Sequence, residues 1–280
     1  MFRLPVTEDI VRDVAFCHEV GEAQNVQCLH RLVGLSLVES ATVYATQQQE
    51  YRVTTILEPL LQPMLTVEEW QITRKSATAS IYKTWWEDRK EFGYCKESQA
   101  QEIVKLAVLA EEKEIAIAVG YAVANNWLNT SRVVGALEIC QEILQLSEDY
   151  RILGSIAQAE NHLGFVRDAM IHYQKALELC PGDDLKTKAT ILHCIANVKT
   201  RQGDIKGAMS LCKQSLQICD SINDVTGKAA TLCQIARLKA EQGDISLHWV
   251  NCNCTCSFPL TDVNFGLAFT KTLMSIICGL

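Results

Sequence analysis

Three cysteines near the C-terminus are the densest group of residues that could do chemistry. Cys252, Cys254 and Cys256 alternate with other residues, and His248 precedes them. Thiolates suit zinc or copper(I), and histidine is a common further ligand. Structural zinc sites, however, usually space paired ligands two to four residues apart and complete the set with a second pair elsewhere. The spacing therefore favours chance clustering, and we predict no bound metal and no cofactor.

Motifs of the common catalytic sites are missing from the sequence. It contains no Gly-x-Ser-x-Gly nucleophile elbow and no His-Glu-x-x-His zinc motif. A phosphate-binding Gly-x-x-x-x-Gly-Lys-Ser/Thr loop is also absent. We therefore expect a protein that is not an enzyme and has no small-molecule substrate.

Composition narrows the function classes further. The chain is 48% hydrophobic and 21% charged, with a net charge of -7, which is typical of a globular protein. Lysines and arginines do not cluster as nucleic-acid binding would require, and no apolar run is long enough to cross a membrane. The start of the sequence lacks the layout of a signal peptide. Thirteen cysteines, an odd number, indicate free, packed thiols in a reducing compartment, so we expect a cytoplasmic protein.

The second half of the chain repeats itself. Three turns begin at Gly164, Gly203 and Gly243, at spacings of 203 − 164 = 39 and 243 − 203 = 40 residues. Leucine, isoleucine and alanine recur 11, 8 and 7 residues before each glycine: Leu153, Ile156, Ala157; Leu192, Ile195, Ala196; Leu232, Ile235, Ala236. Apolar residues at three- and four-residue steps predict helices with one buried stripe, and the glycine predicts the end of the first helix of a hairpin. A single hairpin cannot bury both of its faces, so we expect the hairpins to stack.

These positions resemble the tetratricopeptide repeat. Its second-helix pattern of small, aromatic and small residues followed by proline is matched by Ala169, Tyr173, Ala176 and Pro181. An earlier hairpin fits Val123, Ala124, Ala136 and Cys140, with Ser131 in the turn. Two features depart from the family: Glu160, Lys199 and Lys239 replace its first-helix aromatic, and the period of about 40 exceeds the usual 34. The resemblance implies a mostly helical, right-handed superhelical stack.

In that family the first helices line a concave groove that binds a protein or peptide. By register, the residues that should face this groove are Arg151, Gln158, His193, Asn197 and Arg237. Arginine forks suit a partner's carboxylates, and Asn197 suits its peptide backbone. We therefore predict a protein partner, and neither nucleic acid nor membrane.

The first 111 residues have a different pattern. Helices are predicted over 11–20 and 26–33, followed by β-prone runs at 37–40 and 51–54 around the polar tip 46–50, and by a helix over 56–61. Two helices and a β-hairpin are the outline of a winged helix. Further on, Thr66 and Glu69 form a capping box before a helical run with Trp70, Ile81, Trp85 and Trp86, and Ser98 caps another helix over 103–109.

Residues 32–39, 51–53 and 56–61 resemble the winged helix of bacterial STAND-class signal-transduction NTPases. In that class a P-loop ATPase precedes the winged helix, and repeats such as tetratricopeptides follow. The ATPase motif is absent here, so the resemblance implies the sensor part of a signalling protein, or a truncated remnant without independent function. A DNA-binding regulator is the other alternative, with Gln27, His30 and Arg31 on the second helix. Residues 1–65 hold four Lys/Arg and eight Asp/Glu, a net charge of 4 − 8 = −4, which disfavours it.

Repeat periodicity stops after Ile245. We therefore propose four regions: a partial winged helix with a small β-hairpin (1–65), a helical connector (66–111), tetratricopeptide-like repeats (112–245) and an irregular, poorly ordered tail (246–280).

Overall fold

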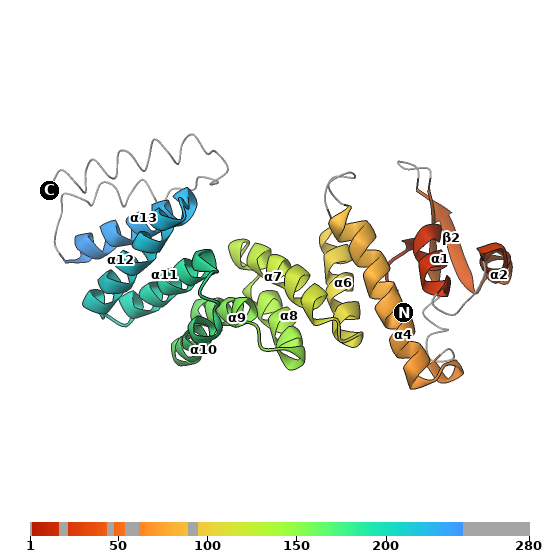
Figure 1. The fold of residues 1–280 in the computed structure, drawn as a ribbon, viewed down its shortest axis with the longest axis horizontal. Coiled ribbons are helices and arrows are strands. Elements are labelled where there is room, and N and C mark those ends of the chain that lie inside the picture. The colour runs from red at the N-terminus through yellow and green to blue at the C-terminus, as the bar shows by residue number, and fades with distance from the viewer. Residues whose placement is uncertain (1, 17–21, 44–47, 54–61, 89–94, 243–280) are drawn as a thin grey trace. The chain divides into compact units, whose positions relative to one another are not determined.

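The computed structural model describes residues 2–16, 22–43, 48–53, 62–88 and 95–242. As predicted, the fold is mostly helical with a small sheet at the N-terminus (Figure 1). The chain forms two compact units that divide between Ser147 and Glu148. The expected helix over 56–61, the irregular tail and the cysteines at 252, 254 and 256 lie outside the described residues.

The N-terminal module consists of three short strands and two helices. In chain order these are β1 (Val6–Thr7), α1 (Glu8–Phe16), α2 (Glu22–Gly34), β2 (Val38–Thr42) and β3 (Gln49–Val53). The hairpin β2–β3 was expected, whereas β1 was not, and it adds a third antiparallel strand in the order β1-β3-β2. Leu29, Val38 and Tyr51 form the core beneath the sheet.

Hydrogen bonds attach this module to the helices that follow it. The Ser80 hydroxyl of α4 (Val67–Ile81) donates to the Asp13 carboxylate of α1 over 2.9 Å. The backbone N–H of Arg3 donates to the buried carboxylate of Glu102, on α6 (Glu97–Leu109), over 2.6 Å. A buried carboxylate that lost this donor would lie in the core unpaired, which is costly. The module is therefore fixed to α4 and α6.

One predicted helix cap is confirmed and the other is wrong. At α4, the Glu69 N–H donates to the Thr66 hydroxyl and the Thr66 N–H donates to the Glu69 carboxylate, which is the expected capping box. Ser98, in contrast, lies inside α6, because that helix begins after Lys96. Its first turn is closed by the Gln99 side chain, which accepts from the Lys96 N–H over 3.0 Å. A glutamine three residues into a helix satisfies an orphan donor as a glutamate would.

Helical elements fill the rest of the described chain. They are η2 (Gln62–Met64), a π-helical turn η3 (Tyr82–Glu87), α7 (Lys113–Asn129), α8 (Val133–Leu146), α9 (Tyr150–Leu163), α10 (Val166–Leu179), α11 (Leu185–Arg201), α12 (Ile205–Ser221) and α13 (Val225–Glu241). In the first unit α7 packs against α6 and α8, and in the second α9 packs on α10, α11 on α12 and α12 on α13.

Burial follows the predicted register. All nine repeated leucine, isoleucine and alanine positions of α9, α11 and α13 are buried. Ala196, Ala208, Cys212, Ile235 and Leu238 form one core cluster across α11, α12 and α13. The small side chains in this cluster let neighbouring helix axes approach closely.

Two of the three predicted glycine turns lie within the described residues and have the expected backbone conformation, whereas Gly243 lies outside them. Gly164 and Gly203 have φ values of 89° and 80°, in the left-handed region where a Cβ is strained. At the first-helix position where the tetratricopeptide repeat has an aromatic residue, this chain has charged residues that form polar pairs. The Glu160 carboxylate lies 2.8 Å from the His172 imidazole, and Lys199 pairs with Asp204 over 2.8 Å. Each pair joins the end of the first helix of a hairpin to its second half.

Candidate functional site

Helices α9, α11 and α13 carry all five residues predicted to bind a partner. Arg151 and Gln158 lie on α9, His193 and Asn197 on α11, and Arg237 on α13, and each is half-buried. We call the surface that contains these five residues the α9–α11–α13 face. Half-burial fits this role, because the side chains are held by their neighbours while part of each remains accessible.

Three of the five residues form one cluster between α11 and α13. The Arg237 guanidinium donates through Nη2 to the Asn197 side-chain oxygen over 3.0 Å. The His193 Nδ1 lies 3.4 Å from the Thr231 hydroxyl of α13. Burial, and then the positive charge of Arg237, lower the pKa of His193, so its imidazole is uncharged at neutral pH. The cluster therefore presents one cation beside neutral polar groups.

A second arginine–asparagine link joins α9 and α11. The Arg201 guanidinium donates through Nη1 to both the main-chain and the side-chain oxygen of Asn161, over 2.7 and 2.9 Å. Both arginines stand 40 residues after their asparagine, the same interval as the repeat. Sequence reasoning missed Asn161 and Arg201, although this shared separation was a usable signal.

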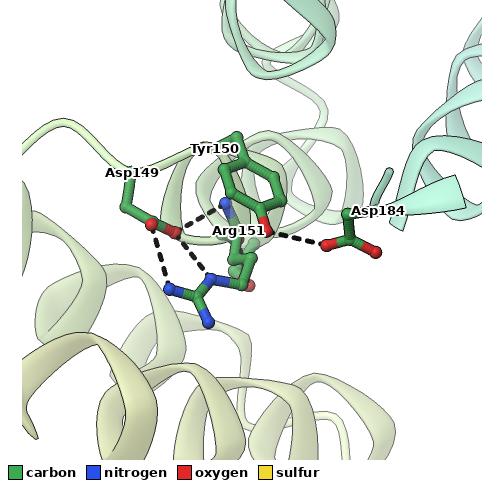
Figure 2. Close-up of polar contacts among 5 residues, drawn as sticks. Asp149, Tyr150, Arg151 and Asp184 are labelled. Carbon is green, nitrogen blue, oxygen red and sulfur yellow. Dashed lines mark hydrogen bonds and ion pairs between the residues drawn. The ribbon is translucent and has the colours of Figure 1, made fainter. Parts of the chain in front are cut away.

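Arg151 belongs to a different cluster, at the start of α9 (Figure 2). Its guanidinium makes two 3.1 Å bonds to the Asp149 carboxylate and lies 5.4 Å from the centre of the Tyr150 ring. The Tyr150 hydroxyl donates to Asp184 over 2.7 Å. The charge of Arg151 is thus balanced by a carboxylate of its own chain, which the sequence prediction did not include.

Electrostatics in this second cluster favour an ionised Asp184. Burial and the hydrogen bond to Asp184 raise the pKa of Tyr150 to about 12. Burial alone would raise the pKa of Asp184, but hydrogen bonds from Tyr150 and Thr187 lower it overall. Asp184 also caps α11 by accepting from the Thr187 N–H over 3.1 Å. The cluster therefore stabilises the start of α11.

Within the described residues, no group of three or more His, Cys, Asp or Glu side chains could hold a metal ion. The three residues considered for DNA recognition, Gln27, His30 and Arg31, are all exposed on α2. No helix in the described part of the chain is both long and apolar enough to cross a lipid bilayer.

Comparison with protein families identifies one segment. Residues 189–220, which cover most of α11 and α12, match the tetratricopeptide repeat family. No curated protein matches the chain.

The solved structures that match this chain share little sequence with it. BtubC from P. vanneervenii is 14% identical, with 94% of this chain and 92% of that one covered and a TM-score of 0.48. Aspartyl phosphate phosphatase F from Bacillus subtilis is 13% identical, with coverage of 96% and 65% and a TM-score of 0.46. A STAND protein with a tetratricopeptide repeat sensor from Pyrococcus horikoshii is 10% identical, with coverage of 99% and 49% and a TM-score of 0.41.

Proposed function

Because residues 189–220 are a tetratricopeptide repeat, we propose that this protein is a non-catalytic interaction scaffold that binds a peptide segment of another protein. The binding surface is the α9–α11–α13 face. The observation that carries the proposal is the convergence of His193, Asn197 and Arg237 between α11 and α13. Polar groups that are held in place and partly accessible are suited to hydrogen bonding with a peptide.

The charge distribution is compatible with an acidic or neutral partner. Residues 1–147 hold 13 Lys/Arg and 20 Asp/Glu, a net charge of 13 − 20 = −7, whereas residues 148–280 hold 13 of each. The net charge of −7 therefore comes from the first unit, and the second unit is neutral overall. A carboxylate that approaches the second unit meets no net repulsion from that unit.

We further propose that the chain is the sensor or regulatory part of a signalling protein, with residues 1–65 as a partial winged helix. The chain order β1-α1-α2-β2-β3 and the strand order β1-β3-β2 support this proposal. So does the attachment of α1 to α4 through Asp13 and Ser80, because a winged helix that packs on its neighbours serves as a structural joint.

The test is a pull-down with the full chain as bait, from the lysate of the source organism. One variant carries Gln158→Ala and Asn197→Ala, and a matched control carries Arg167→Ala and Lys213→Ala, which are exposed on α10 and α12. We expect a partner that the native chain and the control retain and the first variant loses. If no partner binds a well-folded bait, the scaffold proposal is wrong.

A DNA-binding role is the second candidate, because α2 exposes Gln27, His30 and Arg31 to solvent. Fluorescence anisotropy with a labelled random-sequence duplex at 50 mM and 200 mM salt tests it. DNA binding predicts an affinity that falls steeply with salt and that Arg31→Ala weakens. Equal anisotropy with and without the protein would exclude this role.

A further inference from the structure

Strand β2 forms one edge of the three-stranded sheet in the N-terminal module. It pairs with β3 along its whole length, and the strand order β1-β3-β2 leaves its other side without a strand among the described residues. Apart from β3, helix α2 is the described element that β2 contacts most. The side chains from Glu39 to Thr42 are all exposed. The outer side of β2 therefore offers backbone groups that are open to solvent.

The register shows which backbone groups of β2 point outward. The Val43 N–H donates to the Gln48 carbonyl over 2.9 Å, and bonded pairs alternate with non-bonded pairs along an antiparallel ladder. By this alternation, Glu39 and Ala41 exchange hydrogen bonds with β3. The outward-pointing N–H and C=O groups belong to the other three residues of the strand, Val38, Ser40 and Thr42. In the part of the chain that the structure describes, no hydrogen bond reaches these outward groups.

Strand β2 lacks the features that usually keep a sheet edge from pairing. Natural edge strands are often very short, carry lysine or proline, or are interrupted by a bulge. The sequence of β2 is Val-Glu-Ser-Ala-Thr, and its register with β3 is unbroken over five residues. The opposite edge of the sheet, in contrast, is the two-residue strand β1. The edge at β2 can therefore accept a further strand through main-chain hydrogen bonds.

We propose that β2 pairs with β2 of a second copy of this chain, in an antiparallel register centred on Ser40. In this register Ser40 lies opposite Ser40 of the second copy and Val38 lies opposite Thr42, so every outward group is used and about six hydrogen bonds form. Glu39, the only charged residue of β2, then lies opposite the neutral Ala41. A register centred on Glu39 would place two carboxylates opposite each other, which is unfavourable. The strand is thus complementary to itself in bonding pattern and in charge.

Charge also determines how this pairing should respond to salt. Within each copy, Arg52 of β3 lies opposite Glu39, so the junction itself carries little net charge. The first unit as a whole has a net charge of 13 − 20 = −7, so two copies repel each other at longer range. Salt screens this repulsion, and association should therefore strengthen as the ionic strength rises. A strand of five residues buries less than the roughly 1,200 Å² of a stable interface, so the dimer should be weak.

Sedimentation equilibrium of the full chain under reducing conditions, at concentrations up to about 1 mM, measures the dimer dissociation constant. Ala41→Glu places a carboxylate opposite Glu39 of the second copy at both symmetry-related positions, and should weaken the dimer about two- to thirtyfold. Ala41→Lys creates opposite-charge pairs there and should strengthen it by a similar factor, a gain that misfolding would not produce. Ala79→Glu and Ala79→Lys, at an exposed position of α4, are the matched controls and should leave the constant unchanged.

Amide hydrogen exchange of the native chain, followed by NMR, tests the register itself. Dilution of the dimer should speed exchange at the outward-pointing amides of Val38, Ser40 and Thr42. Exchange at Glu39 and Ala41 should stay constant, because their N–H groups already bond to β3. A chain that remains monomeric at every concentration would overturn the inference. So would a dimer that neither Ala41 variant affects, or one that leaves the outward-pointing amides unprotected, because either result would place the contact elsewhere.

Discussion

Replacement of Gln234 by methionine should make the protein more stable. Gln234 lies on α13 and is only 4% exposed, and both polar atoms of its carboxamide are buried without a hydrogen-bond partner in the described part of the chain. Each unpaired buried polar group costs about 1–3 kcal/mol. Methionine has a similar length and no such groups, so even the lower bound predicts a gain of about 2 kcal/mol for Gln234→Met.

Thermal and urea unfolding measure this gain, with hydrogen exchange of the α13 amides to localise it. For a chain of this size, about 2 kcal/mol corresponds to a rise in Tm of roughly 4–8 °C. Gln214→Met is the matched control, because Gln214 is exposed on α12 and its replacement should change stability by less than about 0.5 kcal/mol. A loss of stability in Gln234→Met would refute the reasoning, since it would show that the buried amide is paired, for example by a trapped water.

Three other predictions concern single contacts. Tyr150→Phe removes the hydrogen bond to Asp184 and should cost about 1 kcal/mol in urea unfolding at pH 7. Folding lowers the pKa of Asp184, so its ionised carboxylate stabilises the folded state at pH values above the unfolded pKa of about 3.9. This stabilisation is lost as the pH falls through the folded pKa. The stability cost of Tyr150→Phe should therefore shrink below about pH 4. Gly203→Ala places a Cβ at a φ of 80° and should cost about 1 kcal/mol, whereas Gly182→Ala, which meets open space without a positive φ, should change stability little in the same assay. Burial raises the pKa of Cys140 to about 12, so mass spectrometry should find its alkylation by iodoacetamide at pH 8 about a hundredfold slower, or more, than that of an exposed cysteine, and fast alkylation would mean that this part of the core opens.

In the N-terminal module, local sequence patterns predicted some elements and missed others. The β-prone runs correctly indicated the hairpin β2–β3, because strand preference and a polar tip are local properties. They did not indicate β1, since two residues carry no periodicity and pair only with β3, more than forty positions away. The cap of α6 was missed for a similar reason, because a serine and a glutamine both favour the first turn and the fold selected the glutamine at position 99.

Only part of the candidate site could be predicted from the sequence. Its helices, and the helix face on which its residues lie, could be predicted from the repeat register, because helical geometry places residues three and four apart on one face. Which side chains of the chain bind one another could not be predicted from the register. Arg151 was expected to bind a carboxylate of another protein, yet it binds Asp149, two residues earlier in its own chain. Arg237 binds Asn197, which lies 40 residues earlier on another helix.

By itself, the sequence determined that the second half of this chain folds as stacked helical hairpins with turns at Gly164 and Gly203. Burial of a periodic apolar stripe and the left-handed backbone of glycine are local requirements that leave few alternatives. The tertiary structure alone decided which polar groups meet, because hydrogen bonds such as Arg201 to Asn161 depend on the placement of two separate helices to within a few tenths of an ångström.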